Sequence, residues 1–399
     1  MPGGGHRPPP GEAIPGGGDR RRSRPGCVSG DSHPTAVSSG PSAHARSGSA
    51  ARPQPAGTGA APATLTAYRR AAHAHLTPGA LAYLEGGAGA ERTLRANEAA
   101  FDRYVIRPTV LTGAARIDTA TELLGTRLAT PLLVAPFGLD RLFHPDGHRA
   151  VVQGAAAADT VAIASSSSGY TLEDVHAASP EGAWAFQVSA LGPMGVVART
   201  ARRAAAAGYR ALCITVDTPR PGWRERTLED PDPPSALALA SANYGPEDYA
   251  ERTAGAVGWT WEMVAEVGDA AGIPWLAKGV LTAADARAAV AHGAAAVIVS
   301  NHGGRQLDGA PAAIDALPEV VAAVGGTVPV IVDGGVRHGS DVLVALALGA
   351  TAVGIGRPAA WGLTVGGADG VARVLQILTE DYEIARTLAG GLDVTRAPA

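Results

Sequence analysis

The chain has 399 residues, enough for one large barrel or two ordinary domains, and its composition (46% hydrophobic, 18% charged) is normal for a soluble globular protein. Residues 1–60 hold seven Arg and three acidic residues, whereas the rest holds 26 basic and 34 acidic residues, which gives no electrostatic case for nucleic-acid binding. No apolar run approaches the roughly 20 residues of a membrane span, so we expect no membrane partner.

The first 60 residues are mainly Gly, Pro, Ser, Ala and Arg, with almost nothing to bury, so we predict a disordered tail. The arginines at 20–22 invite a twin-arginine export interpretation, but no apolar segment follows them. Cys27 lies in this tail and Cys213 in an apolar strand, so a disulfide framework is not expected. We expect a cytoplasmic protein without a metal site.

Residues 61–399 are predicted to form one folded domain. A helical segment over 64–84 ends at Gly86-Gly87, and from residue 131 onward apolar strand runs alternate with Ala-rich helical stretches such as 146–158, 193–207, 282–292 and 340–348. The predicted strands are 131–136, 161–165, 183–188, 211–216, 275–280, 294–299, 328–332 and 351–355. Eight βα units predict a TIM (β/α)8 barrel. A doubly wound open sheet is the alternative, but no Gly-x-Gly-x-x-Gly follows the first strand.

One connection, 224–259, is long and contains the run PDPP at 231–234. Long ordered loops at the active face of a barrel are often lids. The segment is therefore either a lid or a disordered insertion.

The run 300–308, SNHGGRQLD, leaves the carboxyl end of the sixth predicted strand, where α/β folds keep their chemistry. In it His302 can take a proton near neutral pH, and Arg305 can bind a carboxylate through two parallel hydrogen bonds. The pair predicts a site for a substrate with a carboxylate beside a carbon to be deprotonated or oxidised. Asp217, after the fourth strand, could orient His302 and stabilise its imidazolium, or could cap a turn.

Glycine-rich turns follow the last two predicted strands, DGGVR at 333–337 and GR at 356–357. Barrels frequently bind a phosphate there, because glycines let backbone N–H groups approach the oxygens, but ordinary turns are the alternative. Lys278, the only lysine in the chain, ends the fifth strand, where its ammonium could stabilise a reduced flavin or form a Schiff base. These residues alone also allow an isomerase or an aldolase that acts on a phosphorylated substrate.

Together with YLEGGA at 83–88, followed by Thr93, Leu94 and Asn97, these runs form a recognisable pattern. Over about residues 64–390 the chain resembles the FMN-dependent α-hydroxy acid oxidases and dehydrogenases, such as glycolate oxidase, lactate oxidase and mandelate dehydrogenase, and particularly the hydroxymandelate oxidase branch. The resemblance implies that FMN oxidises an (S)-2-hydroxy acid to the 2-oxo acid and that O2 is the electron acceptor, giving H2O2. The alternatives are a dehydrogenase or monooxygenase-type enzyme with another acceptor, or a flavin-binding barrel with attenuated activity.

The resemblance also implies a role for each matching residue. His302 is the base, paired with Asp217, and Lys278 stabilises the reduced flavin near N1 and O2. Substrate binding is implied for Arg305, Tyr83 and Arg224. Contacts to the flavin ring and ribityl chain are implied for Pro136, Phe137, Gly138, Ser165, Gln187, Thr215 and Ser300. The ribityl and phosphate end falls to Asp333, Gly334, Gly335, Val336, Arg337, Gly356 and Arg357. A homo-oligomer, often a tetramer in this family, is implied as well.

Two positions depart from the family pattern. Ser189 stands where the family usually has a Tyr, two residues after Gln187, and a small Ser in the run 165–168 (Ser167) stands where glycolate oxidases carry a Trp. Losing two aromatic side chains predicts a larger pocket, which favours a substrate bulkier than glycolate. Gly138, where many oxidases carry Ala, leaves more space over the flavin.

Overall fold

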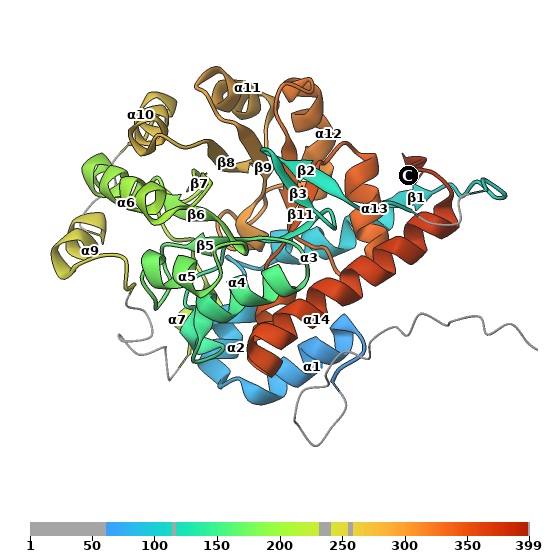
Figure 1. Cartoon of the computed structure of the whole chain (residues 1–399), viewed down its shortest axis with the longest axis horizontal. Coiled ribbons are helices and arrows are strands. Elements are labelled where there is room, and N and C mark those ends of the chain that lie inside the picture. The colour runs from blue at the N-terminus through green and yellow to red at the C-terminus, as the bar shows by residue number, and fades with distance from the viewer. Residues whose placement is uncertain (1–60, 114–116, 231–240, 254–257, 398–399) are drawn as a thin grey trace, which may run out of the picture. The chain divides into compact units, whose positions relative to one another are not determined.

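Eight parallel strands close into a barrel in the computed structural model (Figure 1). The structure describes residues 61–113, 117–230, 241–253 and 258–397, so the predicted tail over 1–60 lies outside the described residues. In order around the barrel the strands are β4 (Leu132–Val134), β5 (Ala162–Ser165), β6 (Ala183–Ser189), β7 (Ala211–Thr215), β8 (Trp275–Val280), β9 (Ala296–Val299), β10 (Val330–Asp333) and β11 (Ala352–Ile355). Pairing of β11 with β4 closes the barrel. The predicted TIM barrel and its eight strands are confirmed.

The helices that follow the strands surround the barrel (Figure 1). They are α4 (Gly147–Ala157), α5 (Leu172–Ala178), α6 (Met194–Ala207), α7 (Glu225–Leu228), α9 (Pro246–Thr253), α10 (Trp261–Ala271), α11 (Ala283–Ala291), α12 (Ala313–Val324), α13 (Gly339–Ala347) and α14 (Arg357–Ala389). The 33-residue α14 is kinked at Gly366 and Gly367, where Gly367 has a φ of +55°. Both α7 and α9 lie in the long connection after β7, of which residues 231–240 and 254–257 lie outside the described residues.

The segment before the barrel differs from its prediction. Instead of one helix over 64–84, the structure has α1 (Leu65–His75) and α2 (Pro78–Glu85), with Leu76 and Thr77 in extended conformation between them. Pro78 disfavours helical backbone in the residue before it, and the Thr77 side chain caps α2 by accepting from the N–H of Ala80 at 3.3 Å. The segment predicted to be helical over 64–84 therefore consists of two helices.

Several short elements were not predicted from the sequence. They are α3 (Arg92–Ala99), the pair β1 (Tyr104–Ile106) and β12 (Val394–Arg396), the hairpin β2 (Thr121–Leu123) and β3 (Thr126–Leu128), and the 3₁₀ turns η1 (Phe101–Arg103), η2 (Asp140–Leu142) and η3 (His302–Gly304). Strands of three residues are too short to show a period that distinguishes them from loops.

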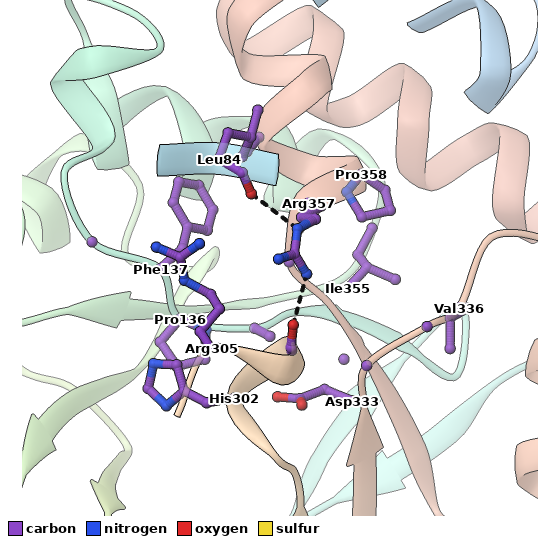
Figure 2. A pocket seen from close by; sticks show the side chains of 18 of the residues that line it. Leu84, Pro136, Phe137, His302, Arg305, Asp333, Val336, Ile355, Arg357 and Pro358 are labelled. Atoms are coloured by element: carbon purple, nitrogen blue, oxygen red, sulfur yellow. Dashed lines mark hydrogen bonds between the residues drawn. The ribbon is translucent and has the colours of Figure 1, made fainter. Parts of the chain in front are cut away.

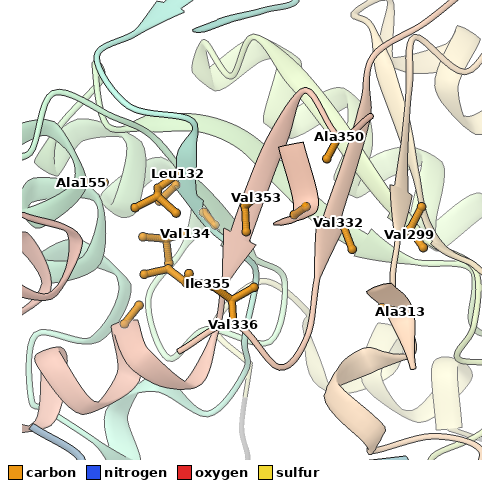
Figure 3. Packing of buried hydrophobic residues seen from close by; sticks show 14 of the residues in the cluster. Leu132, Val134, Ala155, Val299, Ala313, Val332, Val336, Ala350, Val353 and Ile355 are labelled. Atoms are coloured by element: carbon orange, nitrogen blue, oxygen red, sulfur yellow. The ribbon is translucent and has the colours of Figure 1, made fainter. Parts of the chain in front are cut away.

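Side chains alternate along the barrel strands between two apolar clusters. In β5, Ile163 belongs to an inner cluster with side chains from the other strands and the β2–β3 hairpin, while Ala162 and Ala164 belong to an outer cluster under the helices. Figure 3 shows part of the outer cluster, where β4 and β11 lie beside each other. Because every barrel strand is buried on both sides, each reads as a continuous apolar run, and all eight carboxyl ends meet at one rim.

Candidate active site

His302 and Asp217 meet at this rim. His302 begins η3 directly after β9 with a φ of +59°, and its Nδ1 lies 3.2 Å from Oδ1 of Asp217, which follows β7. Burial lowers the pKa of His302, and its hydrogen bond to Asp217 opposes that shift only in part, so the ring is neutral at neutral pH. A neutral ring that donates Nδ1–H to Asp217 keeps Nε2 as a proton acceptor.

Asp217 stays ionised beside this ring. Burial raises the pKa of its carboxyl, but the hydrogen bond from His302 and the charges of His302 and Lys278 outweigh burial and hold the pKa below its usual range. Its Oδ2 is buried and has no hydrogen-bond partner among the described residues. The carboxylate can therefore stabilise a positive charge that forms on the imidazole.

Lys278 is almost completely buried, 4% exposed, in the carboxyl-terminal half of β8. Its Nζ donates to Ser300 Oγ at 2.8 Å and pairs with Asp333 Oδ2 at 3.1 Å. Burial lowers the pKa of this ammonium, but the Asp333 and Asp217 carboxylates outweigh burial and hold the pKa above its usual value. Lys278 thus places a permanent positive charge at the rim, joined to Ser300 after β9 and to Asp333 in β10.

Arg305 and Tyr83 form a stacked pair beside the catalytic candidates. The guanidinium carbon of Arg305 lies 4.5 Å from the centre of the Tyr83 ring, and Nη1 donates to the carbonyls of Tyr83 and Gly86. Its Nη2 is buried and has no hydrogen-bond partner among the described residues. Since a buried donor without a partner costs free energy, Nη2 indicates a place for an anionic ligand.

Arg224 is bonded to the loop that carries Arg305. Its Nε donates to the Arg305 carbonyl at 3.3 Å, and Nη2 donates to Gln306 Oε1 at 3.2 Å. Burial and the nearby charge of Arg305 lower the pKa of Arg224 to about 10, so the Arg224 guanidinium is still charged at neutral pH.

A polar network links the ends of β5, β6 and β7. The Gln187 Nε2 donates to Thr215 Oγ1 and to Ser189 Oγ, both at 3.0 Å, and its Oε1 accepts from Ser165 Oγ at 3.2 Å. The hydroxyl of Ser189 therefore binds Gln187. Gly138 faces Ser167 across the same rim, since a Cβ on Gly138 would lie 2.9 Å from the Ser167 Cβ.

The two glycine-rich turns lie at the opposite end of the rim. Gly334 and Gly335 have φ values of +102° and +86°, and a Cβ on Gly335 would lie 2.0 Å from the Asn97 carbonyl oxygen. Only glycine can follow this path. The N-terminus of α14, beginning at Arg357 after Gly356, lies at the same end and offers backbone N–H groups to an anion.

The two arginines of this end are tied to the protein. Arg357 donates from Nε to the Leu84 carbonyl at 2.9 Å, as Figure 2 shows, and from its other nitrogens to Gly303 and Gly86. Burial and the charges of Arg305 and Arg337 lower the pKa of Arg357 to about 9. Arg337 pairs with Glu98 at 2.8 Å and lies 5.1 Å from the centre of the Trp361 ring, while its Nε is buried without a partner among the described residues.

These groups line two adjoining cavities. The first, about 810 Å³, is lined by Arg305 and by both glycine-rich turns. The second, about 1600 Å³ including its open mouth, is lined by Gly138, Ser167, Ser189 and Arg224, and by Ser241 and Tyr244 from the long connection. Both are lined by Tyr83, Pro136, Phe137, Gly138, Lys278 and His302. Of the predicted site residues, all but Asp217 and Ser300 line one of the two cavities.

Sequence reasoning assigned no role to several residues that hold this rim together. Asp140, fully buried, accepts from the N–H groups of His148 (2.6 Å) and Gly169 (2.9 Å) and from Ser168 Oγ (2.9 Å). His148, also fully buried, bonds through Nε2 to the Phe137 carbonyl at 2.7 Å. Their partners are distant in sequence or are backbone groups, so only proximity to the recognised motifs could have indicated them.

A family model described as FMN-dependent dehydrogenase matches residues 72–397. The chain belongs to this family. An L-lactate oxidase from Nostoc sp. is 40% identical over 348 residues, 82% of this chain and 94% of the relative. Glycolate oxidase 1 from Zea mays is 41% identical over 335 residues, 81% of this chain and 90% of the relative. A crystal structure of mandelate oxidase has a TM-score of 0.79 at 37% identity, covering 85% of this chain and all of that chain.

The cofactor of this family member is FMN, and the described residues fit it. The first cavity has a phosphate-compatible end, formed by the glycine turns and the α14 N-terminus, with the partnerless Arg337 Nε beside it. Lys278 supplies a buried positive charge where the two cavities meet. Among the described residues, every helix is too short or too polar to cross a bilayer.

The state of His302 can be tested without a substrate. Asp217→Asn should lower the pKa of His302 further, because Asp217 supplies the charge and the hydrogen bond that oppose burial. Titration of ¹⁵N-labelled histidine by NMR measures this pKa. As a control, Asp308→Asn removes a carboxylate bonded to Arg92 and Thr93 and should leave it unchanged. An unchanged or raised pKa in Asp217→Asn would contradict the assigned electrostatics.

Proposed function

We propose that this protein is an FMN-dependent (S)-2-hydroxy-acid oxidase, which converts a 2-hydroxy acid to the 2-oxo acid and reduces O2 to H2O2. The observation that carries the proposal is a neutral His302, backed by Asp217 at 3.2 Å, in the same cavity as an Arg305 guanidinium with a partnerless Nη2. The named activities of the relatives, lactate oxidase, glycolate oxidase and mandelate oxidase, support it.

Arg305 binds the substrate carboxylate. Its partnerless Nη2 supplies a hydrogen-bond donor. The Tyr83 ring, stacked on the guanidinium, fixes the plane of the guanidinium and so the direction from which a carboxylate binds. Arg224, whose Nε bonds to the Arg305 backbone, adds a second positive charge at the substrate side. Two fixed guanidinium groups orient the substrate so that its α-carbon faces His302.

His302 accepts a proton from the α-carbon or the hydroxyl of the bound acid. The proton arrives at Nε2, and the imidazolium that results is stabilised by the ionised Asp217 at Nδ1. Bound FMN would supply the acceptor for the two electrons and the second hydrogen that leave the substrate, and O2 would then take up both electrons and two protons to give H2O2. The Lys278 ammonium supplies a fixed positive charge beside His302 for negative charge that develops on the cofactor.

The cofactor itself is held by residues from seven strand ends. We assign the flavin ring and ribityl chain to Pro136, Phe137, Gly138, Ser165, Gln187, Thr215 and Ser300. We assign the ribityl and phosphate end to Asp333, Gly334, Gly335, Val336, Arg337, Gly356 and Arg357. The lining of the two cavities and the α14 N-terminus support the assignment. Residues 61–399 as one FMN-binding domain, a homo-oligomer and a cytoplasmic location stay predictions from the sequence.

The substrate side chain is bulky. The second cavity has only small groups at Gly138, Ser167 and Ser189, and the Ser189 hydroxyl is bound to Gln187. A methyl group, as in lactate, would leave much of this space to water, whereas a larger apolar or aromatic group would bury surface there.

Anaerobic mixing with a panel of 2-hydroxy acids tests the function. We expect at least one acid to bleach the absorption of the bound FMN, and air to restore it with one H2O2 formed per 2-oxo acid. In His302→Ala, FMN should stay bound while its reduction slows by about 100-fold or more, because the base is lost. His338→Ala, which changes an exposed histidine, is the control. Bleaching at the wild-type rate in His302→Ala would remove His302 from this role.

Substrate size can be tested at Ser189. In Ser189→Tyr, a phenol fills part of the second cavity, so kcat/KM for a bulky acid such as (S)-mandelate should fall by about tenfold or more relative to (S)-lactate. Ser189→Ala, which adds no volume, should leave the ratio of the two kcat/KM values near that of the wild type. An unchanged ratio in Ser189→Tyr would place the substrate side chain elsewhere.

A further inference from the structure

Gln306 joins the two loops that carry the catalytic pair. We propose that it is a positioning residue, which holds Asp217 and Arg224 in place relative to His302 and Arg305. The inference rests on the proposed function for the roles of these four residues. It assigns to Gln306 no contact with the reacting atoms.

One loop, residues 217–224 after β7, occupies all four hydrogen-bonding positions of the Gln306 amide. Its Nε2 donates to the carbonyls of Asp217 and Arg220, both at 2.9 Å. Its Oε1 accepts from the N–H of Gly222 and from Arg224 Nη2, both at 3.2 Å. A primary amide offers two donor hydrogens and two acceptor lone pairs, so the side chain is fully satisfied in this single orientation.

The two loops need such a link because the strands that they follow are not neighbours in the barrel. Asp217 follows β7 and His302 follows β9, and β8 lies between these strands. The backbones of the two loops pack closely, since a Cβ on Gly222 would lie 2.3 Å from the Arg305 carbonyl oxygen. That contact limits the distance between the two loops, and the hydrogen bonds of the Gln306 amide fix their relative position.

The two halves of the amide serve different partners. The NH2 group holds the backbone of Asp217, whose carboxylate fixes the tautomer and pKa of His302. The oxygen holds the guanidinium of Arg224 at the substrate side. Loss of the donor half should therefore impair proton removal, and loss of the acceptor half should weaken substrate binding.

Two substitutions separate these halves. Gln306→Met has a similar shape and forms none of the four bonds, whereas an ionised Gln306→Glu keeps both acceptor bonds and loses both donor bonds. In anaerobic stopped-flow, we expect both variants to lower the limiting rate of flavin reduction by about tenfold, as expected for a displaced catalytic group. Only Gln306→Met should raise the half-saturating substrate concentration, while in Gln306→Glu it stays within about twofold of wild type.

A double-mutant cycle distinguishes positioning from general stability. If Gln306 acts through Asp217, Gln306→Met should change the reduction rate by less than about twofold in the Asp217→Asn background. A full tenfold loss in that background, or a rate loss that follows a fall in FMN content, would overturn the proposal. Gln153→Met, at an exposed glutamine that donates to the Ala178 carbonyl, is the matched control.

A measurement without substrate keeps the two proposals apart. Displacing Asp217 weakens the bond that opposes burial, so the pKa of His302 should be lower in Gln306→Met than in the wild type when followed by histidine NMR. If no 2-hydroxy acid reduces the wild-type flavin, the proposed function fails, and this pKa still decides the positioning role. An unchanged pKa would overturn the role of Gln306 even in an active oxidase.

Discussion

The buried ion pair of Lys278 and Asp333 is the interaction on which the rest of the rim depends. A buried ammonium is tolerated only when it is paired and hydrogen-bonded, and Lys278 meets both conditions through Asp333 at 3.1 Å and Ser300 at 2.8 Å. The same Ser300 hydroxyl accepts the His302 backbone N–H at 3.0 Å, so it helps to hold the left-handed conformation at His302. Burial has the larger influence on two neighbouring groups, raising the pKa of Asp217 and lowering that of His302. The Lys278 ammonium lowers both pKa values.

A second constraint connects Arg305 to Arg357. The carbonyl of Gly86, at the end of α2, accepts from Arg305 at 2.7 Å and from Arg357 at 3.0 Å. The carboxyl end of a helix carries partial negative charge, which favours guanidinium groups there. One helix terminus thus holds Arg305 and Arg357 together, although the charge of Arg305 contributes, after burial, to lowering the pKa of Arg357. Figure 2 shows both between α2 and the strand ends.

The sequence predicted the barrel well because each strand is buried on both sides and reads as an apolar run between Ala-rich helices. It did not show the break at Leu76 and Thr77, where Pro78 divides a helical pattern. It also missed the strands of three residues, which are stabilised by pairing with distant strands, as β1 is with β12. Motifs next to strand ends gave His302, Arg305 and Lys278. They could not give the role of Gln306, whose partners lie more than 80 residues away in the chain and are mostly backbone groups.

We propose that a carboxylate anchored by Arg305 beside a neutral His302 makes this rim a site for 2-hydroxy acids. The most informative measurement compares anaerobic flavin reduction by an (S)-2-hydroxy acid with reduction by its uncharged primary amide at the same concentrations. Because hydrogen bonds between charged groups are worth about 1.5–3 kcal/mol each, the acid should give a kcat/KM about 100-fold higher than the amide. Equal values for the two compounds would contradict the anchoring of a carboxylate by Arg305.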